Sequence, residues 1–174
     1  MKNKNKSLVV HLVASFLSAI LICLPVLAAS TNSIGATVTA QNISVVVTTS
    51  GSVPYGNVAL SGQKSSITVS ATQNAVNNGN ITEAFNIKTS NATSTGGTWT
   101  ITTATGTIDQ YTHDFSTTTG SLWVRLAAVD TYAAATGSIP VNATTTIDLR
   151  IGIPSSVSEY SAKTISVTIQ AVQP

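Results

Sequence analysis

His113 is the one histidine after residue 29, and Asp114 follows it directly in the segment QYTHDFS. A nucleophilic active site needs a base beside the nucleophile and a third group that orients the base. Adjacent residues of a strand point to opposite faces, so His113 and Asp114 do not form a ready dyad. His113 shares a side with Tyr111 and Phe115 instead, which predicts a partly buried structural histidine. No Gly-x-Ser-x-Gly motif occurs and Cys23 is the sole cysteine, so the pattern argues against nucleophilic catalysis.

The acidic residues offer no better catalytic site. A glycosidase needs two carboxylates at a defined separation, whereas each acid here stands alone among Thr and Ser residues. Asp148 alternates with Arg150 in TTTIDLRIGIP, which predicts a cross-strand ion pair or plain solvent exposure. There is no Asp-x-Asp-x-Asp loop and no cluster of Cys and His of the kind that binds metals. We therefore expect no enzyme activity, no metal and no cofactor.

Aromatic residues are the remaining candidates for a binding site. Exposed Trp and Tyr rings stack on sugars and supply polar groups at their tips. Trp123 lies opposite the alternating Leu122, Val124 and Leu126 and next to Arg125, whereas Trp99 is in phase with Ile101 and is expected in the core. The candidate ligand-binding residues are Trp123, Arg125, Tyr132 and Tyr160. The alternative is that Trp123 packs beneath a loop or within an interface.

Residues 1–29 have the pattern of a secretory signal peptide, with a basic start, an apolar run and the small residues Ala28 and Ala29. An uncleaved membrane anchor is the alternative, because the apolar run is almost long enough to span a bilayer. Three of the 8 Lys and Arg residues fall in this leader, and the rest of the chain is slightly acidic. Such a balance gives no clustered basic surface for nucleic acid or an anionic membrane. We expect a secreted or cell-surface protein that has no membrane contact once the leader is cleaved.

Short apolar alternations predict strands along the remainder of the chain. The clearest are Ile43/Val45/Val47, Ile67/Val69/Ala71, Ile81/Phe85/Ile87, Trp99/Ile101, Tyr111/His113/Phe115, Leu122/Val124/Leu126, Ile147/Leu149/Ile151/Ile153 and Ile165/Val167/Ile169/Ala171. A further short edge strand is expected at Val58 and Leu60. Seven to nine strands at such regular intervals predict an all-β, immunoglobulin-like sandwich of two antiparallel sheets. A closed barrel is the lesser alternative, and residues 30–174 are expected to form one domain.

Two connections carry specific expectations. Asn77–Asn80 reads as a turn between two strands, because Asn and Gly tolerate positive φ. Residues 127–138 (AAVDTYAAATGS) fit either one helical turn or a crossover loop between the sheets.

Two segments resemble the immunoglobulin-like domains of prokaryotic secreted proteins. TVSATQNAVNNGNITEAFNIKTSN is similar to the strand, Asn-Gly turn and strand of the alpha-galactosidase-associated and cell-adhesion-related families. GSIPVNATTTIDLRIGIPSSVSEYSAKTISVTIQAV resembles their closing pair of strands. Together the segments cover under half of the chain beyond the leader. The resemblance implies a non-catalytic domain at a cell surface or beside a carbohydrate enzyme.

These observations predict a structural or adhesive role at the cell surface or in extracellular matrix. Ile43–Thr49 and Thr164–Val172 are β-branched and lack the lysines that usually blunt sheet edges, so self-association through strand edges is expected. The partner is then a second copy or another surface protein. The alternative is a carbohydrate-binding module around Trp123, with cell-wall or extracellular polysaccharide as its ligand.

Overall fold

The computed structural model describes residues 35–104 and 107–174. The predicted leader, residues 1–29, lies outside the described residues. The chain divides into two units, Met1–Val38 and Thr39–Pro174. In the first unit the described residues, 35–38, are all exposed and form neither helix nor strand. None of the described residues forms a helix long and apolar enough to cross a membrane.

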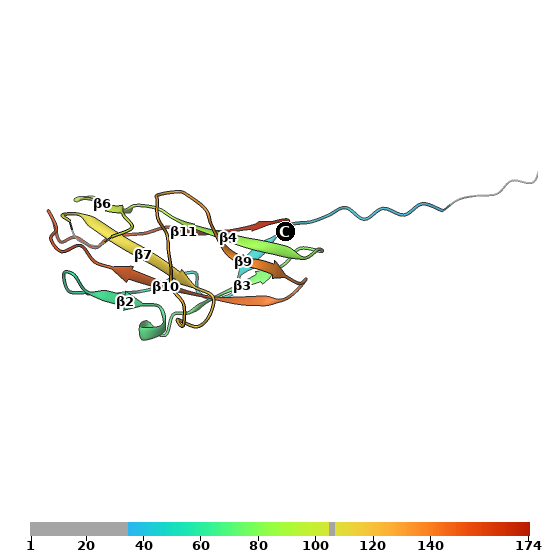
Figure 1. Cartoon of the computed structure of the whole chain (residues 1–174), viewed down its shortest axis with the longest axis horizontal. Helices are drawn as coiled ribbons and strands as arrows, with labels where there is room; N and C mark the ends of the chain where they lie inside the picture. The colour runs from blue at the N-terminus through green and yellow to red at the C-terminus, as the bar shows by residue number, and fades with distance from the viewer. Residues whose placement is uncertain (1–34, 105–106) are drawn as a thin grey trace, which may run out of the picture. The chain divides into compact units, whose positions relative to one another are not determined.

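The second unit is built from two β-sheets (Figure 1). The eight-stranded sheet contains β1 Val45–Val47, β2 Gln63–Ser65, β3 Gln73–Asn77, β5 Ala92–Ser94, β6 Gly97–Ile101, β7 Gln110–Ser116, β8 Val124–Arg125 and β10 Thr144–Gly152. Its main order is β1-β3-β10-β7-β6-β5, with β2 paired to β10 and β8 paired to β7. The three-stranded sheet has the order β11-β4-β9, with β4 Glu83–Thr89, β9 Ala133–Ile139 and β11 Val167–Val172. All these pairs are antiparallel except β6 with β7.

Alternating apolar residues join the two sheets in one core. Phe85 and Ile87 on β4 are fully buried and belong to the same cluster as Tyr111 and Phe115 on β7 and Ile147 on β10. Burial of one such side chain contributes about 1.5–3 kcal/mol. The prediction of an all-β chain with two sheets is confirmed. The described residues form more strands than predicted, because short strands such as β2 and β5 arise from pairing with neighbouring strands rather than from a pattern of their own.

The Asn77–Asn80 segment is a connection between the sheets rather than a hairpin turn. β3, before it, pairs with β1 and β10, whereas β4, after it, pairs with β11 and β9. No residue from Asn77 to Asn80 has a positive φ, so the prediction that Asn and Gly would adopt positive φ in a turn here was wrong. The buried Asn77 side chain holds the connection instead. Its amide donates to the carbonyls of Ile81 and Ile139, and its oxygen accepts from the N–H of Gly79.

Three further local predictions were wrong. Ile67–Val69 forms the 3-10 helix η1 rather than a strand, and Val58 and Leu60 lie in a segment without strand structure. Residues 133–139 form the strand β9, although a helical turn or a loop was expected there. The sequence AAATGSI has little strand propensity of its own, so β9 depends on its backbone pairing with β4.

Gly79 lies in a closely packed part of the Asn77–Asn80 connection. The carboxylate of Glu83 and the carbonyl of Asn42 occupy the space where a Cβ on residue 79 would lie. We expect Gly79→Ala to lower the free energy of unfolding by about 1–3 kcal/mol, because the added methyl overpacks a filled site. Gly137→Ala on β9 is the matched control, since its Cβ would meet open space. Urea unfolding measures both, and equal stability of the two variants would contradict the packing.

Candidate functional site

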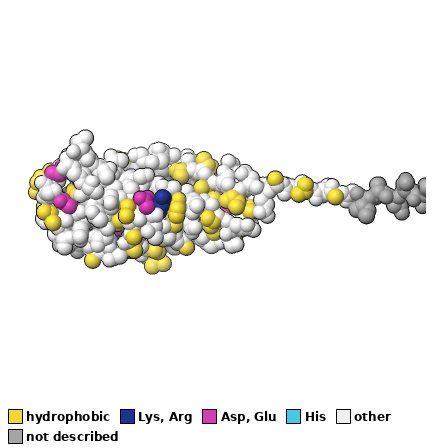
Figure 2. Space-filling model, turned by 90° about the horizontal axis from the view of Figure 1, so that it is seen from above, with side chains coloured by type: hydrophobic (Ala, Val, Ile, Leu, Met, Phe, Trp, Pro, Cys, Tyr) yellow, Lys and Arg dark blue, Asp and Glu magenta, His cyan; other side chains and the backbone are white. Residues whose placement is uncertain are grey.

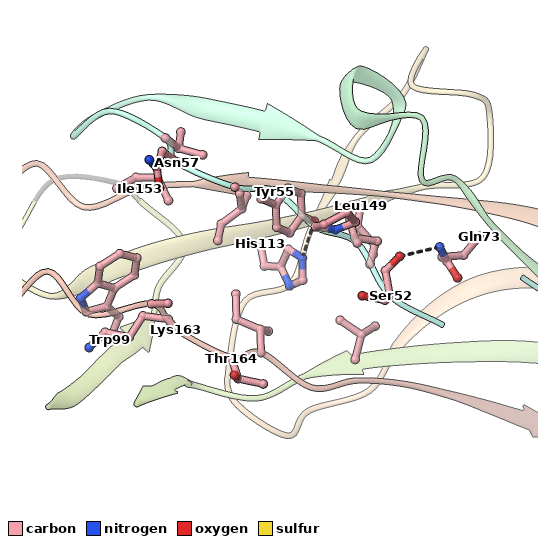
Figure 3. Close-up of a pocket in the computed structure, with 18 of the residues that line it drawn as sticks. Ser52, Tyr55, Asn57, Gln73, Trp99, His113, Leu149, Ile153, Lys163 and Thr164 are labelled. Carbon is pink, nitrogen blue, oxygen red and sulfur yellow. Dashed lines mark hydrogen bonds between the residues drawn. The ribbon is translucent and has the colours of Figure 1, made fainter. Parts of the chain in front are cut away.

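A hollow in the second unit lies between the two sheets, with a cavity volume of about 1040 Å³. We call it the inter-sheet groove. It is lined by residues 51–60, by Ile147, Leu149, Ile151 and Ile153, by residues 160–165, and by Val167 and Ile169. Figure 3 places Trp99 and Lys163 at one end of it and Ser52 and Gln73 at the other. Small-molecule sites are typically about 300–1,000 Å³, so the groove is large for a single small ligand.

The 51–60 segment forms one wall of the groove without becoming a strand. Gly51 and Gly56 have φ of 65° and 63°, which interrupts an extended backbone. Pro54 lies between them and has no N–H to donate to a neighbouring strand. Among the described residues, no backbone hydrogen bond joins this segment to β11. The segment 51–60 therefore does not pair with β11, which is an edge strand of the three-stranded sheet.

β11 has a free edge beside this groove. The N–H of Ser90 donates to the carbonyl of Ser166, which fixes which residues of β11 face β4. Hydrogen-bonded pairs alternate along an antiparallel ladder, so Thr168, Gln170 and Val172 continue the pairing with β4. The backbone groups of the residues between them, Val167, Ile169 and Ala171, point away from β4. Within the described part of the chain these groups have no hydrogen-bond partner.

His113 lies at the inner side of the groove in a small polar cluster. Its Nδ1 is 2.9 Å from the Thr89 hydroxyl oxygen. Its Nε2 is 3.4 Å from the Tyr55 hydroxyl oxygen, a contact that Figure 3 shows. His113 is 1% exposed, and burial lowers its pKa to about 4 although Asp114 acts in the opposite direction. Burial also raises the pKa of Tyr55, and that of Tyr111 to about 12. The imidazole is therefore neutral near pH 7, and His113 is more deeply buried than the partly buried histidine that was predicted.

Asp114 pairs with two arginines on the other side of β7. Its carboxylate accepts from Nε of Arg125, and from Nη2 of Arg150 at 2.7 Å. The guanidinium of Arg150 in turn lies 4.6 Å from the ring centroid of Trp123. Arg125 also donates to the carbonyl of Thr103 at 2.7 Å. Trp123 and Arg125 are thus occupied by contacts within the chain.

The four predicted binding residues do not form one surface. Tyr132 lies over the ammonium of Lys88, 5.2 Å from it, and Lys88 points outward from the small sheet. Trp123 and Arg125 lie beside β7 of the large sheet. Tyr160 is 82% exposed at the mouth of the inter-sheet groove. The residues come from separate faces, so no flat platform of aromatic rings joins them.

Asp148 departs from the prediction of an ion pair or an exposed carboxylate. It is fully buried and accepts from the hydroxyls of Ser66 at 3.0 Å and Thr72 at 2.6 Å. The expected cross-strand ion pair forms between Arg150 and Asp114 instead, on β10 and β7. In the described residues, no three His, Cys, Asp or Glu side chains come together to hold a metal ion.

Sequence reasoning missed the groove itself. Trp99 was expected in the core, and it does pack against the core cluster while also lining the groove. The loop residue Tyr55 reaches His113, which lies far along the chain. One feature of the sequence does indicate that a strand is interrupted here. Pro54 lies between Gly51 and Gly56, in a segment flanked by strongly β-forming residues.

No family model, curated protein or solved structure matches this chain.

The buried imidazole predicts a specific dependence of stability on pH. The unfolded chain binds a proton at His113 near pH 6.5, whereas the folded chain binds it only near pH 4. Between these values the unfolded state holds more protons, so stability falls as the pH is lowered from 6.5 to 4. The slope from one such group is at most about 1.4 kcal/mol per pH unit. Urea unfolding across this range measures it, and His113→Gln is expected to flatten the slope. An equal slope in both proteins would contradict the assignment to His113.

Proposed function

We propose that this chain is an exported, non-catalytic structural or adhesive protein that assembles with copies of itself through free strand edges. Its place is the cell surface or extracellular matrix, after cleavage of the leader following Ala28 or Ala29. The two-sheet packing is proposed to be of the immunoglobulin-like class. A second copy is the first partner, and another surface protein is a further one.

The free edge of β11 is the observation that carries this proposal. Exposed edges template pairing with another chain, and proteins usually protect them with lysines, prolines or bulges. β11 contains neither a charged residue nor a proline, and it pairs with β4 in unbroken register. Lys, Arg, Asp and Glu side chains are also sparse on the face seen in Figure 2. Little electrostatic repulsion therefore opposes association.

The composition supports a non-catalytic role. Only 8% of the residues are charged. The buried polar side chains at His113, Asp114 and Asp148 are engaged with neighbours in the chain. The carbohydrate-binding alternative finds less support, because Trp123 stacks on Arg150 and Tyr132 lies over Lys88.

The proposal predicts that the chain from Ala29 associates with itself as its concentration is raised. Ala171→Pro is the sharpest variant, because it removes an N–H that faces away from β4 while leaving the ladder to β4 intact. We expect it to weaken association at least about tenfold, since an added strand loses a hydrogen bond and meets the proline ring. Light scattering measures the association and thermal melting reports the fold.

Ala134→Pro on β9 is the matched control, because β9 is the opposite edge of the small sheet. It should leave the association through β11 unchanged in any preparation that remains folded. A chain that stays monomeric at millimolar concentration would overturn the proposed function.

A further inference from the structure

We infer that the inter-sheet groove receives the N-terminal arm, residues 34–40, of a second copy of this chain, which adds as a strand to β11. This inference rests on the proposed function and deepens it by naming both sides of the contact.

The groove and the free edge together have the form of a site for a strand. Ile147, Leu149 and Ile151 of β10 present their side chains along the groove, yet the 51–60 wall does not hydrogen-bond to β11. An added strand gains main-chain hydrogen bonds from the edge and side-chain contacts from alternate positions. Val167 and Ile169, whose backbone groups point away from β4, also line the groove, so both kinds of contact are available at the same place.

The arm has the alternation that such a strand requires. In SIGATVTA the residues Ile34, Ala36, Val38 and Ala40 are apolar at every second position, and Thr37 and Thr39 lie between them. A strand places these two sets on opposite faces. Val38 is 96% exposed. The arm therefore combines a β-forming pattern with an apolar side on which Val38 is exposed.

The arm and the groove carry little charge. No Lys, Arg, Asp, Glu or His occurs between Ala29 and Gln63, so the arm is uncharged. Lys163 is the charged residue in the lining of the groove, and its ammonium already pairs with Glu159. His113 is neutral near pH 7, as shown above. An uncharged strand can therefore enter without leaving an ion unpaired.

Hydrogen bonds within the chain fix the residues at the end of the arm. The Asn80 side chain donates to the carbonyl of Ala40 and accepts from the N–H of Asn42, each at 2.8 Å. The N–H of Ser44 donates to Glu83 at 2.7 Å. These bonds hold Ala40, at the end of the arm, together with Asn42 and Ser44 at the connection between β3 and β4.

The alternation supplies a matched pair of variants for the test. Val38→Asp places a carboxylate on the side that enters the groove, whereas Thr37→Asp places the same charge on the opposite side. Both residues are exposed in the single chain, so neither change should alter the melting temperature. Self-association of the chain from Ala29 is measured by light scattering for both variants and for the unchanged chain.

We expect Val38→Asp to weaken association at least about tenfold, because burying an unpaired charge is costly, and Thr37→Asp to change it by less than about twofold. A synthetic peptide of residues 30–41 should inhibit association, and the same peptide with Val38→Asp should not. If Val38→Asp and Thr37→Asp change self-association equally, this inference is overturned, whereas the proposed function is not. An unchanged chain that remains monomeric would overturn both.

Discussion

The interrupted backbone of residues 51–60 is the constraint on which the open side of the molecule depends. Gly51 and Gly56 adopt left-handed backbone angles and Pro54 lacks an N–H, so this segment passes β11 without pairing with it. As a result, β11 keeps a free edge and the inner face of β10 borders a groove. A regular strand at this position would close the sandwich and remove both features.

Asp114, His113 and one oxygen of Asp148 have hydrogen-bond partners within the chain, whereas Asp148 Oδ2 and Thr112 Oγ1 are buried and have none among the described residues. Asp114 is held between Arg125 and Arg150, and Asp148 accepts from two hydroxyls. His113 contacts Thr89 and is kept neutral by burial. Buried charges that are paired and hydrogen-bonded have a structural explanation, because an unpaired one would be costly. This is the physical reason for preferring a structural role.

The sequence predicted those strands whose side chains alternate strongly. β4, β7, β10 and β11 follow their apolar patterns because one side of each lies against the core. β9 was not predicted, since Ala, Thr and Gly carry no pattern and the strand exists only through pairing with β4. The Asn77–Asn80 connection shows a related limit. Its composition indicates a bend, but the sheet that each flanking strand joins is decided by distant partners.

The candidate site depended still more on tertiary contacts. Trp123 and Arg125 were predicted from local alternation, yet the contacts that occupy them come from Arg150 and Asp114, which are distant in sequence. The groove unites residues from several segments, and no local pattern reveals a cavity between sheets. By contrast, the absence of charged residues from Thr164–Val172 could be read directly from the sequence, because it depends on composition alone.

Residue-resolved amide hydrogen exchange on the chain from Ala29, before and after assembly, tests the central claim most directly. In the monomer, the amides of Val167, Ile169 and Ala171 should exchange rapidly, because they face away from β4, while Thr168 and Gln170 stay protected. On assembly the first set should become protected, and the arm residues Thr37 and Thr39 or their neighbours should gain protection with them. Assembly that leaves Val167, Ile169 and Ala171 exchanging as fast as in the monomer would contradict strand addition at β11.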